Sequence, residues 1–223
     1  MEKIWIKTYP PGVPAEISID HIASLVTVFE DACRKYADQV AYISMDREMT
    51  YGELDRLSRD FAGWLQSLGL KKGDCVALMM PNLLQYPVAL FGTLRAGCVV
   101  ANCNPLYTPR ELEHQLKDSG AKAIVIVENF AGVLQQVLAN TAVKHVITTQ
   151  LGDLLPLPKR WIVNFVVKRV KKMVPVWHID GAIEFRDALA RGAAATFTPV
   201  VITREDIAFL QYTGGTTGVS KGA

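Results

Sequence analysis

The stretch that decides the fold runs from residue 75 to residue 101 and has the sequence CVALMMPNLLQYPVALFGTLRAGCVVA. Its two ends, residues 75–80 and 98–101, are short apolar runs typical of buried strands. Residues 84–96 between them have the length and apolar spacing of a helix. The order strand, helix, strand predicts two parallel strands joined by a crossover helix.

The same stretch raises the question of a membrane span, because no charged residue occurs over the twenty positions 75–94. Pro81 follows the short β-rich run, however, and Gln85 and Pro87 fall where the middle of the bilayer would be. A buried strand that leads into a buried helix accounts for the same residues, since central parallel strands are apolar on both faces. We therefore predict no membrane span here.

The alternation of strands and helices continues on both sides of this stretch. Further strands are predicted at residues 40–44, 123–127 and 145–149, and further helices at residues 25–37, 133–140 and 183–191. This order predicts an α/β fold, with a mostly parallel sheet flanked by helices.

Two more helices have recognisable ends. Thr50 to Glu53 and Thr108 to Glu111 are capping-box patterns, in which the threonine accepts the N3 amide and the glutamate reaches back to the cap amide. Gly69 and Gly120 follow the last apolar residues at helical spacing and are expected to end these helices.

Composition limits the class of protein. The chain has 223 residues, of which 50% are hydrophobic and 21% charged, and its net charge is +2. These values exclude disordered, collagen-like and disulfide-scaffold proteins, and they do not suggest a nucleic-acid partner. The four cysteines form no CxxC pair, so we expect reduced, buried thiols, no metal site and a cytoplasmic location.

Residues 152–176 interrupt the alternation as a basic insertion. Six bases lie between Lys159 and Lys172 with no acid among them. On a helical wheel one face is apolar and the opposite face basic; the two sets are Val163, Val166, Val167, Val170, Met173 and Val174, and Lys168, Lys171 and Lys172. Two interpretations stay open: residues 159–174 contact an anionic membrane at its inner face, or the valine face packs on the domain.

The apolar run at residues 207–212 predicts a strand that leads into TGGTTGVSKGA, residues 213–223. Three glycines within five positions leave backbone amides unshielded, and the threonines and Lys221 add donors, so this loop can wrap phosphate oxygens. A Walker A loop is excluded because Ser220 precedes the lysine and Gly222 follows it. The dinucleotide fingerprint GxGxxG does not match either. A plain Gly/Thr hairpin turn is the alternative.

Residues 212–222 resemble the nucleotide-loop signature of the adenylate-forming ligases, which include acyl-CoA synthetases, luciferases and peptide-synthetase adenylation domains. Gly214 and Ser220 depart from the commonest residues, which are serine or threonine and proline. Upstream, the stretches MTYGEL at 49–54, GDCVA at 73–77 and NPLYTPREL at 104–112 resemble bacterial long-chain fatty acid–CoA ligases.

The resemblance implies a two-step reaction in which ATP and a fatty acid form acyl adenylate, and CoA then displaces AMP, with Mg2+ on the phosphates. It implies that the nucleotide-binding residues are Thr213, Gly214, Gly215, Thr216, Thr217, Gly218, Val219, Ser220, Lys221 and Gly222. The family's catalytic and metal-binding residues come later, so residues 1–223 are expected to be an inactive fragment, the first part of the large N-terminal domain. The alternatives are a stand-alone nucleotide- or anion-binding α/β domain and another acid–CoA ligase of the superfamily.

Overall fold

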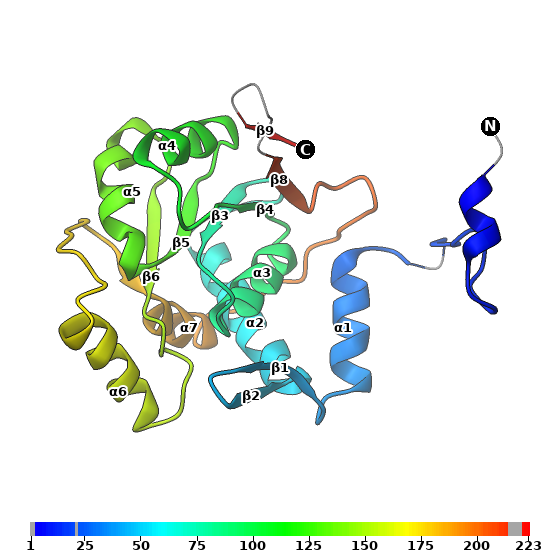
Figure 1. Cartoon of the computed structure of the whole chain (residues 1–223), viewed down its shortest axis with the longest axis horizontal. Coiled ribbons are helices and arrows are strands. Elements are labelled where there is room, and N and C mark those ends of the chain that lie inside the picture. The colour runs from blue at the N-terminus through cyan, green and yellow to red at the C-terminus, as the bar shows by residue number, and fades with distance from the viewer. Residues whose placement is uncertain (1–2, 21, 214–219) are drawn as a thin grey trace.

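The structure is a computed structural model that describes residues 3–20, 22–213 and 220–223. Within these residues a seven-stranded sheet has the order β7-β6-β5-β3-β4-β8-β9 (Figure 1). Its strands are β3 (Cys75–Met79), β4 (Val99–Asn102), β5 (Ala123–Val127), β6 (His145–Thr149), β7 (Ile183–Glu184), β8 (Phe209–Thr213) and β9 (Lys221–Gly222). Every pairing in this sheet is parallel except that of β8 with β9. The predicted α/β class with a mostly parallel sheet is confirmed.

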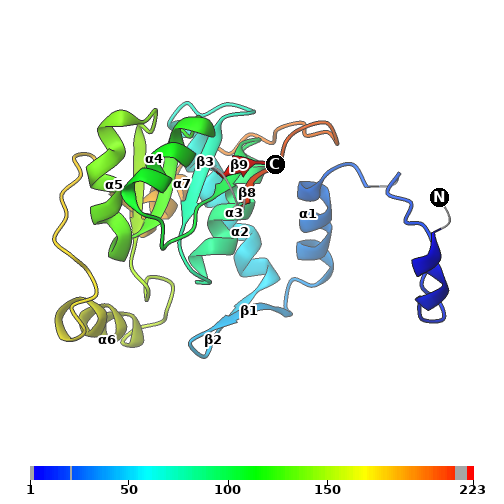
Figure 2. The same ribbon diagram turned by 45° about the horizontal axis from the view of Figure 1, so that its top comes forward.

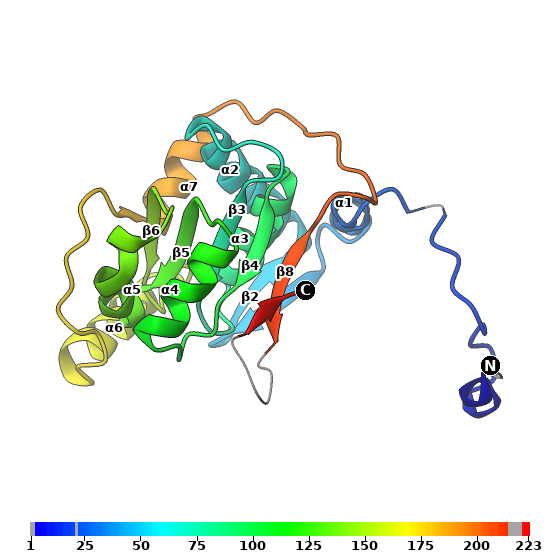
Figure 3. The ribbon, with the colours of Figure 1, turned by 90° about the horizontal axis from the view of Figure 1, so that it is seen from above.

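Helices cover both faces of the sheet (Figure 3). One face carries α2 (Tyr51–Ser67), α3 (Gln85–Arg95) and α7 (Phe185–Ala193), with α1 (Leu25–Lys35) packed outside α2 and α3; the other face carries α4 (Pro109–Asp118) and α5 (Ala131–Val137). Short 3₁₀ turns occur at η1 (Ile4–Thr8), η2 (Glu128–Phe130) and η3 (Leu138–Asn140). The molecule therefore has two apolar cores, one on each side of the sheet.

Strand β3 shows why the central run is free of charge. Val76 and Leu78 lie in the core formed with α2, α3 and α7, whereas Ala77 and Met79 lie in the core formed with α4 and α5. All four side chains are buried, as expected for a central parallel strand. Residues 75–94 are thus a strand and a helix, as predicted. No helix in the described ranges is long and apolar enough to cross a bilayer.

The helices over the first core approach each other closely at glycines. A Cβ atom on Gly192 of α7 would lie 1.8 Å from the Asp60 carbonyl oxygen of α2. A Cβ atom on Gly92 of α3 would lie 2.8 Å from Cδ1 of Phe61 and 2.9 Å from the Ser58 backbone carbonyl oxygen. Because the backbone itself fills the space, these two contacts require glycine.

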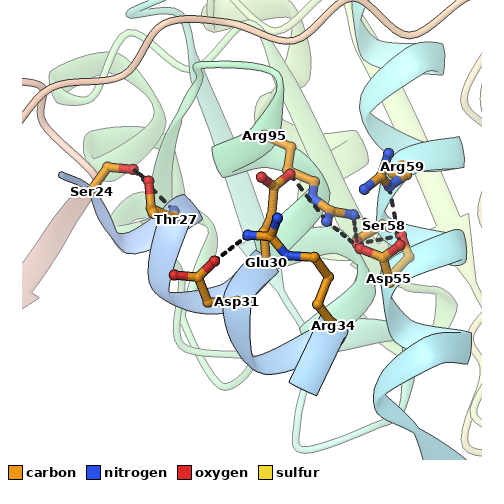
Figure 4. Close-up of polar contacts among 9 residues, drawn as sticks. All are labelled: Ser24, Thr27, Glu30, Asp31, Arg34, Asp55, Ser58, Arg59 and Arg95. Atoms are coloured by element: carbon orange, nitrogen blue, oxygen red, sulfur yellow. Dashed lines mark hydrogen bonds and ion pairs between the residues drawn. The ribbon is translucent and has the colours of Figure 1, made fainter. Parts of the chain in front are cut away.

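A buried guanidinium joins three helices, as Figure 4 shows. The side chain of Arg95 on α3 is fully buried, and its Nη1 donates to the Asp55 carbonyl at 2.7 Å and to Ser58 Oγ at 2.8 Å on α2. Its Nη2 forms ion pairs with the carboxylates of Asp55 and of Glu30 on α1. The guanidinium carbon lies 4.9 Å from the ring centre of Phe29, also on α1. Arg95 thereby ties α1 to the helical layer.

One predicted strand lies outside the main sheet. Residues 40–44 form β1 (Val40–Ser44), which pairs antiparallel with β2 (Arg47–Thr50) in a separate hairpin. Met45 and Asp46 have φ angles of 49° and 58°, the left-handed conformation that a two-residue hairpin turn requires. Residues 40–44 therefore form the predicted strand, but this strand does not belong to the mostly parallel sheet.

The two capping boxes have different outcomes. At α4 the box is complete: Thr108 Oγ1 accepts from the Glu111 amide, and the Glu111 carboxylate accepts from the Thr108 amide at 2.8 Å. At α2 only half of the box forms. Thr50 Oγ1 accepts from the Glu53 amide at 3.1 Å, but the glutamate does not return a bond to the cap amide. The Glu53 carboxylate instead accepts two hydrogen bonds from Arg47 of β2, each 2.7 Å long. A charged donor on the neighbouring strand outcompetes the backbone amide.

Three further helix boundaries can be compared with the predictions. Gly69 and Gly120 have φ angles of +82° and +61° and follow the ends of α2 and α4, which confirms them as stops. The helix predicted at residues 183–191 begins late, because Ile183 belongs to β7 and pairs with Ile147 of β6. The partner strand, rather than local sequence, decides this boundary.

The basic insertion forms α6 (Lys159–Phe165) and a π-helical turn, η4 (Val166–Val170), at the periphery of the molecule (Figure 2). The helical conformation does not reach Met173 and Val174, since Lys172 has a φ angle of 52°, so the predicted apolar face is shorter than expected. No residue of α6 or η4 is buried. The half-buried apolar side chains are Val163, Val166 and Val167. The exposed apolar side chains are Trp161, Ile162, Phe165 and Val170.

The glycine contacts lead to a stability prediction. Gly192→Ala places a methyl group against the α2 backbone and is expected to lower the free energy of unfolding by about 3 kcal/mol. Gly132→Ala in α5 is the matched control, because its Cβ meets nothing closer than Pro175 Cγ at 3.5 Å. That change is expected to be neutral or to stabilise by up to about 1 kcal/mol. Urea unfolding monitored by circular dichroism measures both; equal stability of the two variants contradicts the close approach.

Candidate functional site

The candidate site lies at the carboxyl end of β8. The predicted strand at residues 207–212 is present, shifted by one to two residues, as β8. It pairs parallel with β4, with Asn102 opposite Gln211, and the Asn102 side-chain amide donates to Gln211 Oε1 at 3.2 Å. β8 ends at Thr213, on the sheet edge where the other parallel strands also end. Ligands of open α/β sheets bind at this edge.

A short antiparallel pairing closes the candidate phosphate loop at its base. Thr213 of β8 is opposite Lys221 of β9. Beside them, the Gln211 amide donates to the Ala223 carbonyl at 2.9 Å, and the Ala223 amide donates to the Gln211 carbonyl at 3.0 Å. The threonine and the lysine that begin and end the predicted loop are therefore neighbours on adjacent strands.

The structure describes four of the predicted nucleotide-binding residues. Thr213, Lys221 and Gly222 are exposed, and Ser220 is half-buried. The other six lie outside the described residues: Gly214, Gly215, Thr216, Thr217, Gly218 and Val219. The described arrangement brings a hydroxyl donor and an ammonium donor to one place, as anion binding requires.

Helix α4 contacts the chain on both sides of the loop. The Tyr212 hydroxyl donates to Asp118 Oδ2 at 2.6 Å, and His114 Nε2 donates to the Ser220 carbonyl at 3.0 Å. Tyr212 is buried; burial, and then the hydrogen bond and the negative charge of Asp118, raise the pKa of its phenol above the usual range. Tyr212 is therefore a neutral donor at physiological pH.

Gly222 lies against the ring of Tyr212. A Cβ atom at this glycine would approach Tyr212 Cζ at 3.1 Å and its Oη at 3.3 Å, which is tighter than an ordinary van der Waals contact. A side chain at position 222 would therefore require the Tyr212 ring to shift.

The contacts of α4 with the β8–β9 hairpin were not evident from the sequence. His114 is a half-buried histidine with a hydrogen-bond partner and Asp118 is an exposed charge, but each side chain also contacts the hairpin. Their spacing of four residues places two polar groups on one helix face, and this is the signal that could have indicated a shared contact surface. What lies opposite that face is not visible in local sequence.

In the part of the chain that the structure describes, no group of three His, Cys, Asp or Glu side chains could hold a metal ion. The four cysteines are free and buried, as predicted. Burial raises the pKa of the Cys33 and Cys75 thiols to about 11 and that of the Cys98 and Cys103 thiols to about 12. None of them is poised as a nucleophile.

The family model described as AMP-binding enzyme matches residues 29–223. The chain belongs to this family. The match includes the whole sheet and both ends of the candidate loop, and it agrees with the adenylate-forming signature predicted at residues 212–222.

Individual relatives agree with this assignment. The chain is 59% identical over its whole length to a long-chain-fatty-acid–CoA ligase of Salmonella typhimurium and 54% identical to that of Haemophilus influenzae. In both comparisons it spans 40% of the relative's length. A long-chain-fatty-acid–CoA ligase from Archaeoglobus fulgidus shares the fold, with a TM-score of 0.70 and 23% identity over 96% of this chain and 38% of that one.

The buried thiols give a prediction for this family member. At pH 8 the raised pKa values keep the thiols protonated, so the native protein is expected to react with a thiol reagent about a hundredfold more slowly than the protein unfolded in urea. Ser18→Cys adds a thiol at an exposed position as a control and is expected to react at once. Rapid native labelling without this added thiol contradicts the described burial.

Proposed function

We propose that this chain is the first part of the large N-terminal domain of a long-chain fatty acid–CoA ligase. Identity of 59% to a ligase of that name over the whole chain supports the proposal. The observation that carries it is the loop base at the carboxyl end of β8, where Thr213 and Lys221 lie opposite each other. A phosphate-binding loop needs this combination of donors at the end of a parallel strand.

The proposed reaction has two steps. A fatty acid carboxylate attacks the α-phosphorus of ATP, and acyl adenylate and pyrophosphate form. The thiol of CoA then attacks the acyl carbon, and acyl-CoA and AMP are released. In the first step negative charge gathers on the departing pyrophosphate, and oriented amides, hydroxyls and an ammonium group stabilise it without forming a bond to it.

We assign phosphate binding to the loop residues. Thr213 and Lys221 supply a hydroxyl and an ammonium group from the loop base. The remaining members of the proposed nucleotide site are Gly214, Gly215, Thr216, Thr217, Gly218, Val219, Ser220 and Gly222. We assign no catalytic residue to this chain, which we expect to be inactive alone, because a phosphate loop without the rest of the site offers contacts but no complete active site.

Mg2+ enters the proposal as the ion that accompanies ATP and neutralises phosphate charge. Among the described residues no cluster of three metal-binding side chains exists, so we assign no magnesium ligand to them. The stabilisation of phosphate charge that we assign to this chain comes only from its amide, hydroxyl and ammonium donors.

Two alternatives are less favoured. A stand-alone nucleotide- or anion-binding domain does not explain why identity to the Salmonella ligase extends over the whole chain. A ligase for another acid requires a different substrate preference from relatives that are 54–59% identical. Acid-dependent ATP–pyrophosphate exchange with long-chain, short-chain and aromatic acids decides between these proposals.

Lys221→Ala tests the loop assignment in the full-length protein. Loss of one donor to the pyrophosphate is expected to slow adenylation by a factor that corresponds to about 2 to 4 kcal/mol, and Thr216→Ala is expected to have a similar effect. The readout is palmitate-dependent ATP–pyrophosphate exchange. Lys144→Ala is the control, because this exposed lysine precedes β6 at the opposite edge of the sheet. Unchanged exchange in both loop variants rules out the assignment.

We further propose that the basic insertion docks reversibly on the inner, cytoplasmic face of an anionic membrane. Trp161 and Phe165 are 65% and 61% exposed, and Arg169, Lys171 and Lys172 of the same segment are also exposed. Exposed aromatic rings and bases suit the headgroup boundary, where each base contributes about 1 kcal/mol. Val163, Val166 and Val167 of this segment are half-buried, and packing of these valines on the domain is the competing interpretation that the liposome test addresses.

Two of the six bases already have acidic partners. Lys159 pairs with Asp46 at 3.1 Å, and Lys168 pairs with Glu128 at 3.2 Å. The informative variant therefore changes the remaining bases of the η4 end, Arg169, Lys171 and Lys172, to Gln.

This variant is expected to lose sedimentation with anionic liposomes, and the unmodified protein is expected to detach between 0.1 M and 1 M salt, as the Debye length falls from about 10 Å to about 3 Å. A triple variant at Lys35, Lys144 and Arg191, three exposed bases elsewhere, is the control for net charge. Equal sedimentation of both variants, or none of the unmodified protein, contradicts membrane docking.

A further inference from the structure

We propose that helix α4 is the positioning element of the nucleotide loop, with Asp118 and His114 as its positioning residues. This inference rests on the proposed function and extends it to residues outside the loop. Neither side chain belongs to the loop signature, and each contacts the residue next to a proposed phosphate donor: Asp118 contacts Tyr212, which precedes Thr213, and His114 contacts Ser220, which precedes Lys221.

The two contacts fix the loop at both of its ends. The Tyr212–Asp118 hydrogen bond is 2.6 Å long and the His114–Ser220 bond is 3.0 Å long. His114 and Asp118 are one helical turn apart on the same face of α4. The β8–β9 pairing sets the separation of the two strands, and one rigid helix face holds this pair in place against the sheet at both ends of the loop.

The opposite face of α4 is anchored in the core. Leu112 and Leu116 are fully buried among side chains of β3, β4 and β5. Gln115 is also fully buried, and its Nε2 donates to the Asn102 carbonyl at the end of β4 at 2.8 Å. With the complete capping box at Thr108 as well, α4 cannot shift without breaking core contacts, so it is a firm support for the loop.

Removal of Asp118 has a specific cost. The Tyr212 side chain is buried, and without Asp118 its hydroxyl loses the acceptor that fixes the orientation of the ring. Gly222 packs on that ring and follows Lys221 directly in the chain, so we expect a movement of the ring to displace Lys221 as well. A small displacement of a preorganised donor costs transition-state stabilisation, because its distance to the developing charge increases.

The inference predicts which half-reaction suffers. Pyrophosphate is present only during adenylation, so a displaced loop slows that step. Transfer of the acyl group from supplied acyl adenylate to CoA involves no pyrophosphate and is expected to keep its rate. A merely structural role of Asp118 would lower both half-reactions together, in proportion to the lost folded protein.

The test compares Asp118→Ala with Asp118→Asn in the full-length protein. Asp118→Ala is expected to slow palmitate-dependent ATP–pyrophosphate exchange by about tenfold or more, as expected for loss of a hydrogen bond to a charged group. Asp118→Asn keeps an acceptor and is expected to rescue most of the rate. Thioester formation from supplied palmitoyl adenylate is expected to change less than about twofold in both, since it needs no pyrophosphate contact.

Glu113→Gln is the matched control, because it also removes one negative charge from α4. The Glu113 carboxylate pairs with Lys117 at 2.5 Å, on the same helix. It is expected to leave both half-reactions unchanged. At the other end of the loop, His114→Ala is expected to slow adenylation alone, and His114→Gln, which retains a side-chain donor, is expected to restore part of the rate.

A double-variant cycle identifies the partner of Asp118. If the carboxylate acts through Tyr212, Tyr212→Phe combined with Asp118→Ala is expected to be no slower than the slower single variant. Additive losses, or equal losses in both half-reactions, overturn the positioning role. Absence of long-chain acid-dependent exchange in the unmodified protein overturns the proposed function instead, whereas normal exchange in the unmodified protein and in every α4 variant overturns this inference alone.

Discussion

The parallel pairing of β8 with β4 is the constraint on which the candidate site depends. It joins Asn102 to Gln211, which are 109 residues apart in sequence. Strand β4 lies between the two cores and contributes side chains to both. Its pairing with β8 therefore fixes the register and the direction of β8 in the sheet. The donors at the end of β8 are held in place by this ladder rather than by the loop's own glycine-rich sequence, which has little conformational preference.

The helical layers keep that ladder in place. On one face, glycine contacts and the buried Arg95 bring α1, α2 and α3 together and cover β3 and β4. On the other face, Leu112 and Leu116 of α4 pack on the same strands. A change that loosens either layer is therefore transmitted to β4 and from there to the loop base. The position of the candidate site thus depends on two cores that contain none of its residues.

Local sequence patterns predicted much of this architecture. The strands at residues 123–127 and 145–149 occur at the predicted bounds, because uninterrupted β-branched runs have few alternatives in a buried sheet. The capping box at Thr108 and the stop at Gly120 are correct because backbone groups within one turn decide them. The errors occur where a residue outside the local pattern intervenes: Arg47 of β2, six positions before Glu53, takes the glutamate carboxylate, and the more distant Ile147 pairs with Ile183 in a strand.

The sequence by itself determined the chemistry offered at the end of β8, namely glycine amides, threonine hydroxyls and a lysine in an order that Walker A and dinucleotide loops do not have. It also determined the α/β class, since apolar periodicity is a local property. Only the tertiary structure decided that α4 contacts both ends of that loop, through hydrogen bonds of Asp118 with Tyr212 and of His114 with Ser220. Hydrogen bonds between residues about a hundred positions apart depend on how the helix packs on the sheet, and no local pattern specifies that packing.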